Sequence, residues 1–136
     1  MADLRVLDAN VILRFLLADH PDQSPRCRVL FTRLEAGKET VFLPEIVVAD
    51  VVWTLTSFYR WPKEKTRSFL DRLLALRGVR TVDTARLSHS LELFAERNTD
   101  FTDALVAAEM VAAGRSEIYS FDEHFNRISQ IARIEP

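Results

Sequence analysis

Four aspartates occupy positions at which carboxylates could act together on a substrate, and they are Asp8, Asp50, Asp103 and Asp122. Asp8 and Asp122 each follow a short apolar run that is typical of a strand, and Asp103 falls in the first turn of an alanine-rich helix. The ligand site of an open parallel sheet lies beyond the carboxyl ends of its strands. These three carboxylates, together with Asp50 from an apolar helix, are therefore candidates to meet at one edge of a sheet.

Each carboxylate also has a purely structural interpretation. Asp8, Asp100, Asp103 and Asp122 could each cap a helix, where the positive end of the helix dipole favours negative charge. Asp50 is different, because its helical neighbours at 46, 47, 53 and 54 are Ile, Val, Trp and Thr and supply no cation. An ionised carboxylate buried in such an apolar stretch is unfavourable unless it is paired or bound to a metal. The sequence therefore predicts that another part of the fold compensates Asp50.

Carboxylates that cluster repel one another unless a cation neutralises them. Ligation by oxygen alone indicates Mg²⁺, with Mn²⁺ as a substitute, rather than zinc, because Cys27 is alone and His20, His89 and His124 show no ligand spacing. Such a site suits hydrolysis of a phosphodiester, since the metal lowers the pKa of a bound water and stabilises charge on the phosphoryl oxygens. This chemistry needs no covalent nucleophile.

The pattern of apolar and polar residues predicts strands that alternate with helices. Strands are expected at 4–7, 41–43, 79–82 and 118–119, with 131–134 as a candidate edge strand. Ser24 and Thr84 are predicted N-caps, Gly37 and Gly78 are predicted to end helices, and the helix from 46 to 58 has almost no polar face and is expected to be buried. The alternation predicts an α/β fold of three layers, with a mostly parallel sheet of four to five strands between helices.

Length and composition are those of one globular domain, 1–136. With 48% hydrophobic residues the chain can bury a core without disulfides, and its single cysteine is typical of a reducing compartment. No stretch approaches the roughly 20 apolar residues of a membrane helix, and residues 1–10 lack the pattern of a secretory signal, so we expect a cytoplasmic protein. The net charge of −2, from 18 basic and 20 acidic residues, argues against nucleic-acid binding by charge alone, but without the four aspartates the balance is 18 to 16, or +2.

Four segments, taken together, carry a family resemblance. In order along the chain they are VLDANVILRFLL, ADVVWTL, DFTDALVAA and SFDEHFNRI. The chain resembles the PIN-domain ribonucleases and, in size, the VapC-type toxins of bacterial toxin-antitoxin pairs. The resemblance implies a Mg²⁺-dependent endoribonuclease with a PIN-like fold, a homodimer, a substrate such as tRNA or ribosomal RNA, and a cognate antitoxin that inserts a peptide near the acidic site.

The resemblance also implies the site residues. The first family acid falls on Asp8 with Asn10, the third on Asp103 with Asp100 as its companion, and the last on Asp122, preceded by Ser120. We expect Asp8, Asp103 and Asp122 to ligate the metal. Asn10 and Ser120 would hold carboxylate rotamers, although both could equally be helix caps.

The helix acid of the family falls on Asp50, where the family usually carries Glu. Aspartate is shorter by one carbon–carbon bond, roughly 1.5 Å. Asp50 would therefore ligate directly or through water and help to orient the attacking water, with Glu45 as a stand-in one turn earlier.

Contacts with RNA are predicted from basic side chains. Arg14 lies one helical turn past Asn10, and a basic cluster surrounds Trp61, formed by Arg60, Lys63, Lys65 and Arg67. A solvated helix face is the alternative for this cluster, with Trp61 and Tyr59 as packing anchors. The apolar segment 51–61 is expected in the core, with a dimer or antitoxin surface as the other interpretation.

Two rival functions use a similar sheet. A haloacid dehalogenase-like phosphatase or a receiver domain needs a nucleophilic aspartate and a lysine near a late strand, but the three lysines, Lys38, Lys63 and Lys65, do not follow a late strand. A binding module of the same fold, inactive because Asp50 is short, is the second rival. Cleavage of RNA that depends on Mg²⁺ and on Asp8 would separate a nuclease from both.

Overall fold

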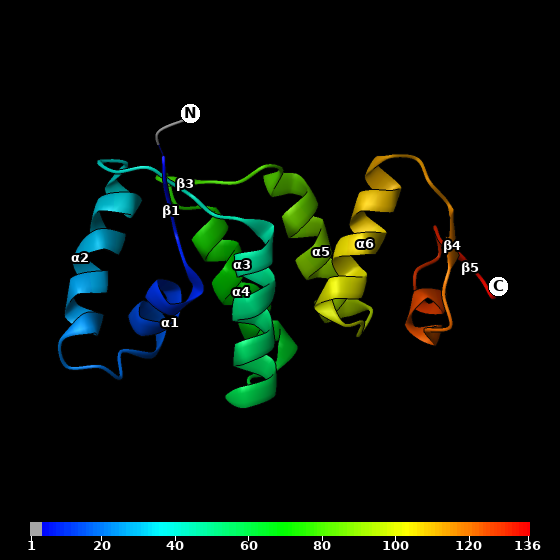
Figure 1. Ribbon diagram of the computed structural model, residues 1–136, viewed down its shortest axis with the longest axis horizontal. Helices are drawn as coiled ribbons and strands as arrows, with labels where there is room; N and C mark the ends of the chain where they lie inside the picture. Colours follow the sequence, from blue (N-terminus) through cyan, green and yellow to red (C-terminus); the bar gives the residue numbers. More distant parts are fainter. Residues whose placement is uncertain (1–3) are drawn as a thin grey trace.

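Strands and helices alternate along residues 4–136, the part of the chain that this computed structural model describes (Figure 1). Most elements come close to the predicted ranges, although each strand is only two or three residues long. A short π-helix, η1, continues α3, and a short 3-10 helix, η2, follows β4. The elements in chain order are β1 (Arg5–Val6), α1 (Ala9–Leu17), α2 (Gln23–Ala36), β2 (Val41–Phe42), α3 (Glu45–Trp53), η1 (Thr54–Phe58), α4 (Lys63–Leu74), β3 (Val79–Arg80), α5 (Thr84–Glu96), α6 (Phe101–Ala112), β4 (Glu117–Tyr119), η2 (Glu123–Arg127) and β5 (Ala132–Ile134).

All strand pairs are parallel, which confirms the predicted α/β class. β1, β2 and β3 form one set in that order, with Val6 opposite Phe42. β4 and β5 form a second set, with Ile118 opposite Arg133, so the edge strand predicted at 131–134 is also confirmed. Among residues 4–136 no strand pairing joins the two sets, and Figure 1 shows β1 and β4 toward opposite ends of the molecule. The five expected strands are therefore present, but they form two sets rather than one continuous sheet.

The division of the sheet separates two of the predicted site residues. β1 and β4 each keep one edge without a neighbouring strand among the described residues, and their side chains Val6 and Tyr119 are 62% and 75% exposed. Asp8 follows β1 and Asp122 follows β4, so they lie at the ends of different sets. Local patterning predicts that a strand forms, but the identity of its neighbour depends on packing across the whole fold.

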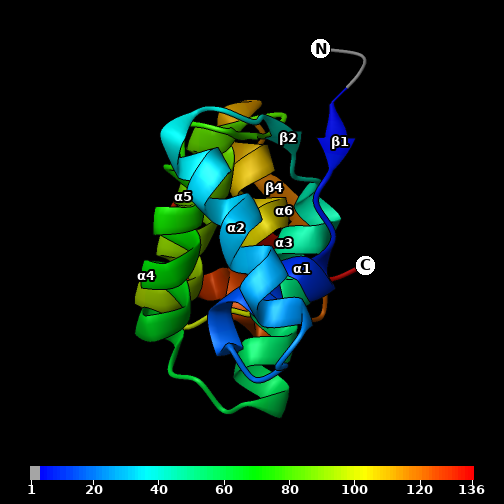
Figure 2. The same cartoon turned by 90° about the vertical axis from the view of Figure 1, so that its left-hand side faces the viewer.

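Helices supply most of the core. α1 packs against α2 and α3, α4 against α5, and α5 along α6, and Figures 1 and 2 show α2 with α1 at one end and α6 beside α5 farther along. The alanines on α6 allow a close approach, since Ala104, Ala107 and Ala108 are almost completely buried. No helix within residues 4–136 is long and apolar enough to cross a membrane.

Two predicted helix caps are wrong by one or two residues. α2 begins after Asp22, and Ser24 instead lies buried inside the first turn, where its hydroxyl donates to the carbonyl of Arg14 and accepts from the N–H of His20. Asp83 caps α5 by accepting from the N–H of Arg86, so Thr84 is the first helical residue. At α5 an aspartate upstream takes the cap position, a residue type that caps as well as Ser or Thr does. At α2 the side chain of Asp22 makes no cap hydrogen bond, and Nδ1 of His20 instead accepts from the N–H groups of Asp22 and Gln23.

The prediction that the helix from 46 to 58 is buried is wrong for one of its faces. Val48 and its neighbours on the inner face are buried, but Ile46, Trp53 and Phe58 are 76%, 65% and 71% exposed. Ile46, Asp50 and Trp53 follow one another at helical spacing, and the π-turn of η1 returns Phe58 to the same side. Asp50 is therefore exposed within an apolar stripe, and it needs no compensating partner because its carboxylate remains in water.

Gly78 does not end α4, which stops at Leu74, but it allows two segments to approach closely. A Cβ at this position would lie 2.1 Å from the carbonyl oxygen of Glu39 and 2.9 Å from the Cα of Leu34, and both atoms belong to the backbone. We expect Gly78→Ala to lower the free energy of unfolding by about 3 kcal/mol, because backbone cannot move aside as a flexible side chain can. Urea unfolding would measure this loss.

Gly114 is the matched control for this substitution. Its φ of 71° is strained for alanine, but a Cβ there meets no atom within 4 Å. Gly114→Ala should therefore lose only about 1 kcal/mol. Equal losses for the two variants would contradict the close approach at Gly78.

Candidate metal centre

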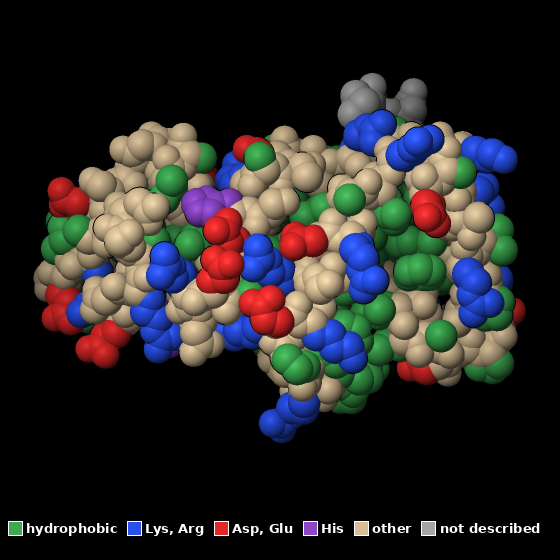
Figure 3. All heavy atoms as spheres, turned by 180° about the vertical axis from the view of Figure 1, so that it is seen from behind, with side chains coloured by type: hydrophobic (Ala, Val, Ile, Leu, Met, Phe, Trp, Pro, Cys, Tyr) green, Lys and Arg blue, Asp and Glu red, His purple; other side chains and the backbone are tan. Residues whose placement is uncertain are grey.

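Three carboxylates and one imidazole come together where the start of α6 meets η2. Asp100, Asp103, Asp122 and His124 each offer one ligand atom, and these atoms lie within 4.8 Å of one another. Figure 3 shows acidic side chains and a histidine gathered near the middle of one face of the molecule. The structure therefore brings together two of the four predicted acids, the predicted companion Asp100, and a histidine.

Local structure on the η2 side fixes Asp122 and His124 relative to each other. Asp122 is the N-cap of η2, and its Oδ1 accepts a hydrogen bond of 2.9 Å from the backbone N–H of His124. The hydroxyl of Ser120 accepts from the N–H of Asp122 at 2.9 Å, so Ser120 holds the backbone of that acid. This segment turns two side chains, two residues apart, toward α6.

Two cations hold the loop that leads into α6. The ammonium of Lys63 donates to the carbonyl of Thr99 at 2.7 Å, and the guanidinium of Arg127 donates to the carbonyl of Asn98. Thr99 is completely buried, and Asp100 follows it as the N-cap residue of α6. Asp103 lies in the first helical turn, so contacts from α4 and from η2 set the position of both acids.

The two central carboxyl groups have opposite electrostatic environments. Burial raises the pKa of Asp103 to about 6, and the nearby carboxyl groups of Asp122 and Asp100 add to the rise. The backbone N–H of His124 lowers the pKa of Asp122, and the adjacent carboxyl of Asp103 lowers it further. Carboxyl groups this close share a proton when no cation is present, with Asp103 as its main holder.

Two buried polar atoms of the group make no hydrogen bond within residues 4–136: Oδ2 of Asp103 and Nδ1 of His124. Nδ1 of His124 lies 3.9 Å from this Oδ2 and 3.6 Å from Oδ1 of Asp122. Buried polar atoms nearly always have a partner; a proton shared with Asp122 would satisfy the carboxyl of Asp103, and one bound cation would satisfy both atoms. Carboxylate oxygens and an imidazole nitrogen are ligands of divalent cations, and the residues present therefore fit such an ion.

The other two predicted acids, Asp8 and Asp50, are outside this group. Asp8 is the N-cap of α1, and its Oδ1 accepts from the N–H of Ala9 at 2.8 Å, so the capping alternative is realised. Asp50 is exposed on α3, and Glu45, the suggested stand-in, forms an ion pair with Arg86. Only Asp103 and Asp122 of the four predicted acids therefore meet in this group.

Most of the basic side chains predicted to contact RNA have partners within the chain. Lys63 is tied to Thr99, Lys65 lies over the ring of Trp61, and Arg67 pairs with Glu96 and Asp71. Arg60 is exposed just after η1.

Arg14 and Asn10 both line a hollow of about 590 Å³ between α1 and α2. The Nε of Arg14 donates to Gln23, which orients its guanidinium. Arg14 is thus the predicted RNA contact that lies nearest in sequence to a predicted acid, Asp8. It also lines an open hollow.

His124 was not predicted from the sequence, where the histidines show no ligand spacing, but the structure brings it into this group. A spacing of two residues would direct the side chains of a strand to the same face, whereas on an α-helix it would separate them. Here the N-cap turn of η2 directs Asp122 and His124 to one point. The sequence Asp-x-His directly after a strand was the available signal.

The raised pKa of Asp103 predicts how stability depends on pH when no metal is bound. The folded chain holds a proton on Asp103 up to about pH 6, whereas the ordinary pKa of 3.8 means that the unfolded chain releases it earlier. The free energy of unfolding should therefore fall as pH rises from about 4 to about 6, while the lowered pKa of Asp122 acts in the opposite sense at lower pH.

Urea unfolding in EDTA, with Asp103→Asn as the reference, measures this contribution. Asparagine cannot ionise, so the variant should gain stability over the natural chain across this pH range and keep the gain above it. A difference that does not change with pH would contradict the burial of Asp103.

Comparison with known proteins gives two results. A sequence profile described as PIN domain matches residues 5–131. A VapC ribonuclease of Aquifex aeolicus (strain VF5) is 23% identical over 125 residues, which are 92% of this chain and 92% of that protein.

Proposed function

Since the chain belongs to the PIN-domain family, we propose that it is a Mg²⁺-dependent endoribonuclease and, like the VapC ribonuclease it resembles, the toxin of a toxin-antitoxin pair. One observation carries this proposal: Asp103, Asp122 and Asp100 meet with His124, and two buried atoms of this group, Oδ2 of Asp103 and Nδ1 of His124, have no hydrogen-bond partner within residues 4–136. The proposed substrate is a cytoplasmic RNA of the tRNA or ribosomal class. Mn²⁺ would substitute for Mg²⁺.

The chain would hold the cation through the carboxylates of Asp103 and Asp122, with Asp100 beside them. A divalent ion at such a site lowers the pKa of a bound water and stabilises negative charge on the phosphoryl oxygens. Ser120 and the backbone of His124 keep the carboxylate of Asp122 oriented, and Lys63 keeps the start of α6 in place.

Asp8 and Asp50 also have proposed roles, which rest on the family resemblance because neither belongs to the acidic group. We propose that Asp8 completes the ligand set and that Asp50 ligates through water and orients the attacking water. Arg14, on the helix that Asp8 caps, would contact a phosphate of the RNA, with Asn10 beside it. Their separation from the acid group favours a second candidate, a PIN-domain binding module that does not cleave RNA.

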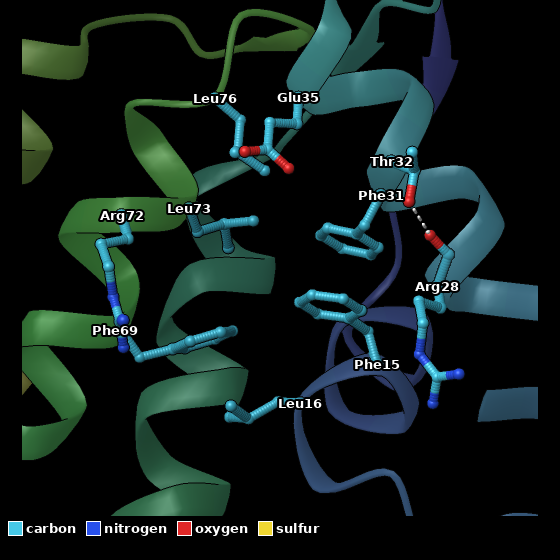
Figure 4. Close-up of a pocket in the computed structure, with 10 residues that line it drawn as sticks. All are labelled: Phe15, Leu16, Arg28, Phe31, Thr32, Glu35, Phe69, Arg72, Leu73 and Leu76. Carbon is cyan, nitrogen blue, oxygen red and sulfur yellow. Dashed lines mark hydrogen bonds between the residues drawn. The ribbon is translucent and has the colours of Figure 1, made fainter. Parts of the chain in front are cut away.

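A groove of about 550 Å³ between α1, α2 and α4 is the proposed docking place for a segment of the antitoxin (Figure 4). Its floor is apolar, and the rings of Phe15 and Phe31 stack there with centroids 4.1 Å apart. Arg28 and Arg72 lie at its rim with Glu35, so an apolar helix with acidic flanks would be complementary. Phe15 is about 10 Å along α1 from Asp8, so such a peptide would lie near that carboxylate rather than near the group on α6 and η2.

A second copy of the chain is the proposed partner for the exposed stripe on α3 and η1. Ile46, Trp53 and Phe58 extend along about 18 Å of helix. Apolar patches of this kind are rarely left exposed on a monomer, and a two-fold axis would pack the stripe against itself.

Incubation with total bacterial RNA tests the proposed activity. The chain, purified without antitoxin, should cleave RNA in Mg²⁺, lose cleavage in EDTA and recover it when Mg²⁺ is restored. Asp8→Ala, which keeps the fold of α1 apart from one cap, should reduce cleavage. Cleavage that persists in EDTA would contradict the metal mechanism, and RNA binding without cleavage would favour the binding module.

A further inference from the structure

His124 is the one member of the acidic group that offers nitrogen rather than oxygen. Its Nδ1 is buried and makes no hydrogen bond within residues 4–136. The same holds for Oδ2 of Asp103 opposite it. The backbone of His124 already binds Asp122, so the residue is anchored at the centre whatever its ring does. Its ring nitrogen lies beside two carboxylates, with which it forms ion pairs only when the ring is protonated, and no hydrogen bond within the described residues occupies it.

The distances around Nδ1 exclude a direct hydrogen bond but suit a shared ion. Nδ1 lies 3.6 Å from Oδ1 of Asp122 and 3.9 Å from Oδ2 of Asp103, beyond hydrogen-bond distances. Two ligands of one divalent cation, each about 2.1 Å from it, stand roughly 3 Å apart when adjacent and roughly 4.2 Å apart when opposite. Both observed separations fall between these limits.

We propose that Nδ1 of His124 is a direct ligand of the divalent cation, so that the centre combines one nitrogen with carboxylate oxygens and binds Co²⁺ and Mn²⁺ more tightly than Mg²⁺. The inference rests on the metal site of the proposed function. Mg²⁺ is a hard cation that takes oxygen, whereas imidazole favours transition metals, and affinity for mixed sites rises from Mn²⁺ to Co²⁺. Mg²⁺ would then support activity through its abundance rather than its affinity.

Replacement of His124 by asparagine removes the ring nitrogen while keeping a polar atom at nearly the same place. The amide oxygen of Asn lies one bond from Cγ, as Nδ1 of His does, so His124→Asn exchanges nitrogen for oxygen at nearly the same place. His89, a half-buried histidine of α5 outside the group, gives the matched control His89→Asn. Asp103→Asn identifies which binding events belong to this centre.

Calorimetric titration of the RNA-free chain with Co²⁺ and with Mg²⁺ gives the first result. His124→Asn should weaken Co²⁺ binding by about tenfold or more and change Mg²⁺ binding by less than about threefold, whereas His89→Asn should change neither. Pulsed electron paramagnetic resonance with Mn²⁺ gives the second. It should detect coupling to a ¹⁴N nucleus in the natural chain and in His89→Asn but not in His124→Asn.

The outcomes distinguish this inference from the proposed function. If Asp103→Asn abolishes metal binding but His124→Asn leaves the affinity for both Co²⁺ and Mg²⁺ unchanged, His124 is not a ligand. That result would overturn the nitrogen ligand but not the metal site. Absence of ¹⁴N coupling in the natural chain would do the same without any variant. A chain that binds neither metal would overturn the inference together with the metal site on which it rests.

Discussion

Asp103→Asn should abolish RNA cleavage while leaving the chain folded. Asparagine keeps the size of the side chain but removes the negative charge that would hold the proposed cation at the start of α6. We expect the rate to fall by about 1000-fold or more, which corresponds to a loss of about 4 kcal/mol of transition-state stabilisation. Initial rates on a labelled RNA in saturating Mg²⁺ would measure this loss.

The stability of the same variant is the control for this prediction. The pKa of Asp103 is raised to about 6, so ionisation of this carboxyl at neutral pH costs the metal-free fold stability relative to the unfolded chain. Asp103→Asn should therefore unfold at the same or a higher urea concentration than the natural chain in EDTA. An inactive variant that is also much less stable would indicate a structural role, and an active one would remove Asp103 from the site.

Trp53→Ser combined with Phe58→Ser should convert the proposed dimer into a monomer. Both side chains are mostly exposed on α3 and η1, so their loss leaves no cavity in the single chain. A two-fold interface contains each residue twice, and buried aromatic residues usually dominate such contacts. We expect the dissociation constant to rise by about 100-fold or more, which sedimentation equilibrium would measure.

Val29→Ser is the matched control for the dimer. Val29 is 57% exposed on α2, away from the stripe, and its replacement should leave the mass unchanged. A double variant that remains a dimer would contradict this interface. It would instead favour a dimer formed through the exposed edges of β1 or β4.

Local patterns predicted the elements and two of the acids. The apolar run before Asp122 and the alanine-rich helix that carries Asp103 formed as expected, and Ser120 lies where it can hold the backbone of Asp122. These features depend on a few neighbouring residues, so the sequence was sufficient to predict them.

Features that depend on distant packing were not predicted. A helix with apolar residues on every side does not reveal which side the fold covers, and the uncovered side carries Asp50. Strand composition does not specify that, within residues 4–136, β4 pairs only with β5, and as a result Asp8 and Asp122 follow strands of different sets. His124 joined the group through the turn of η2, a geometry that helix or strand periodicity does not describe.

The location of a bound cation tests the central claim most directly. Anomalous diffraction at the manganese edge, from crystals of the chain grown in Mn²⁺, would locate the ion without reference to activity. We predict a peak within bonding distance of the carboxylates of Asp103 and Asp122, at the start of α6. A well-occupied peak elsewhere, or none at these carboxylates at saturating Mn²⁺, would contradict a metal-dependent nuclease built on this centre.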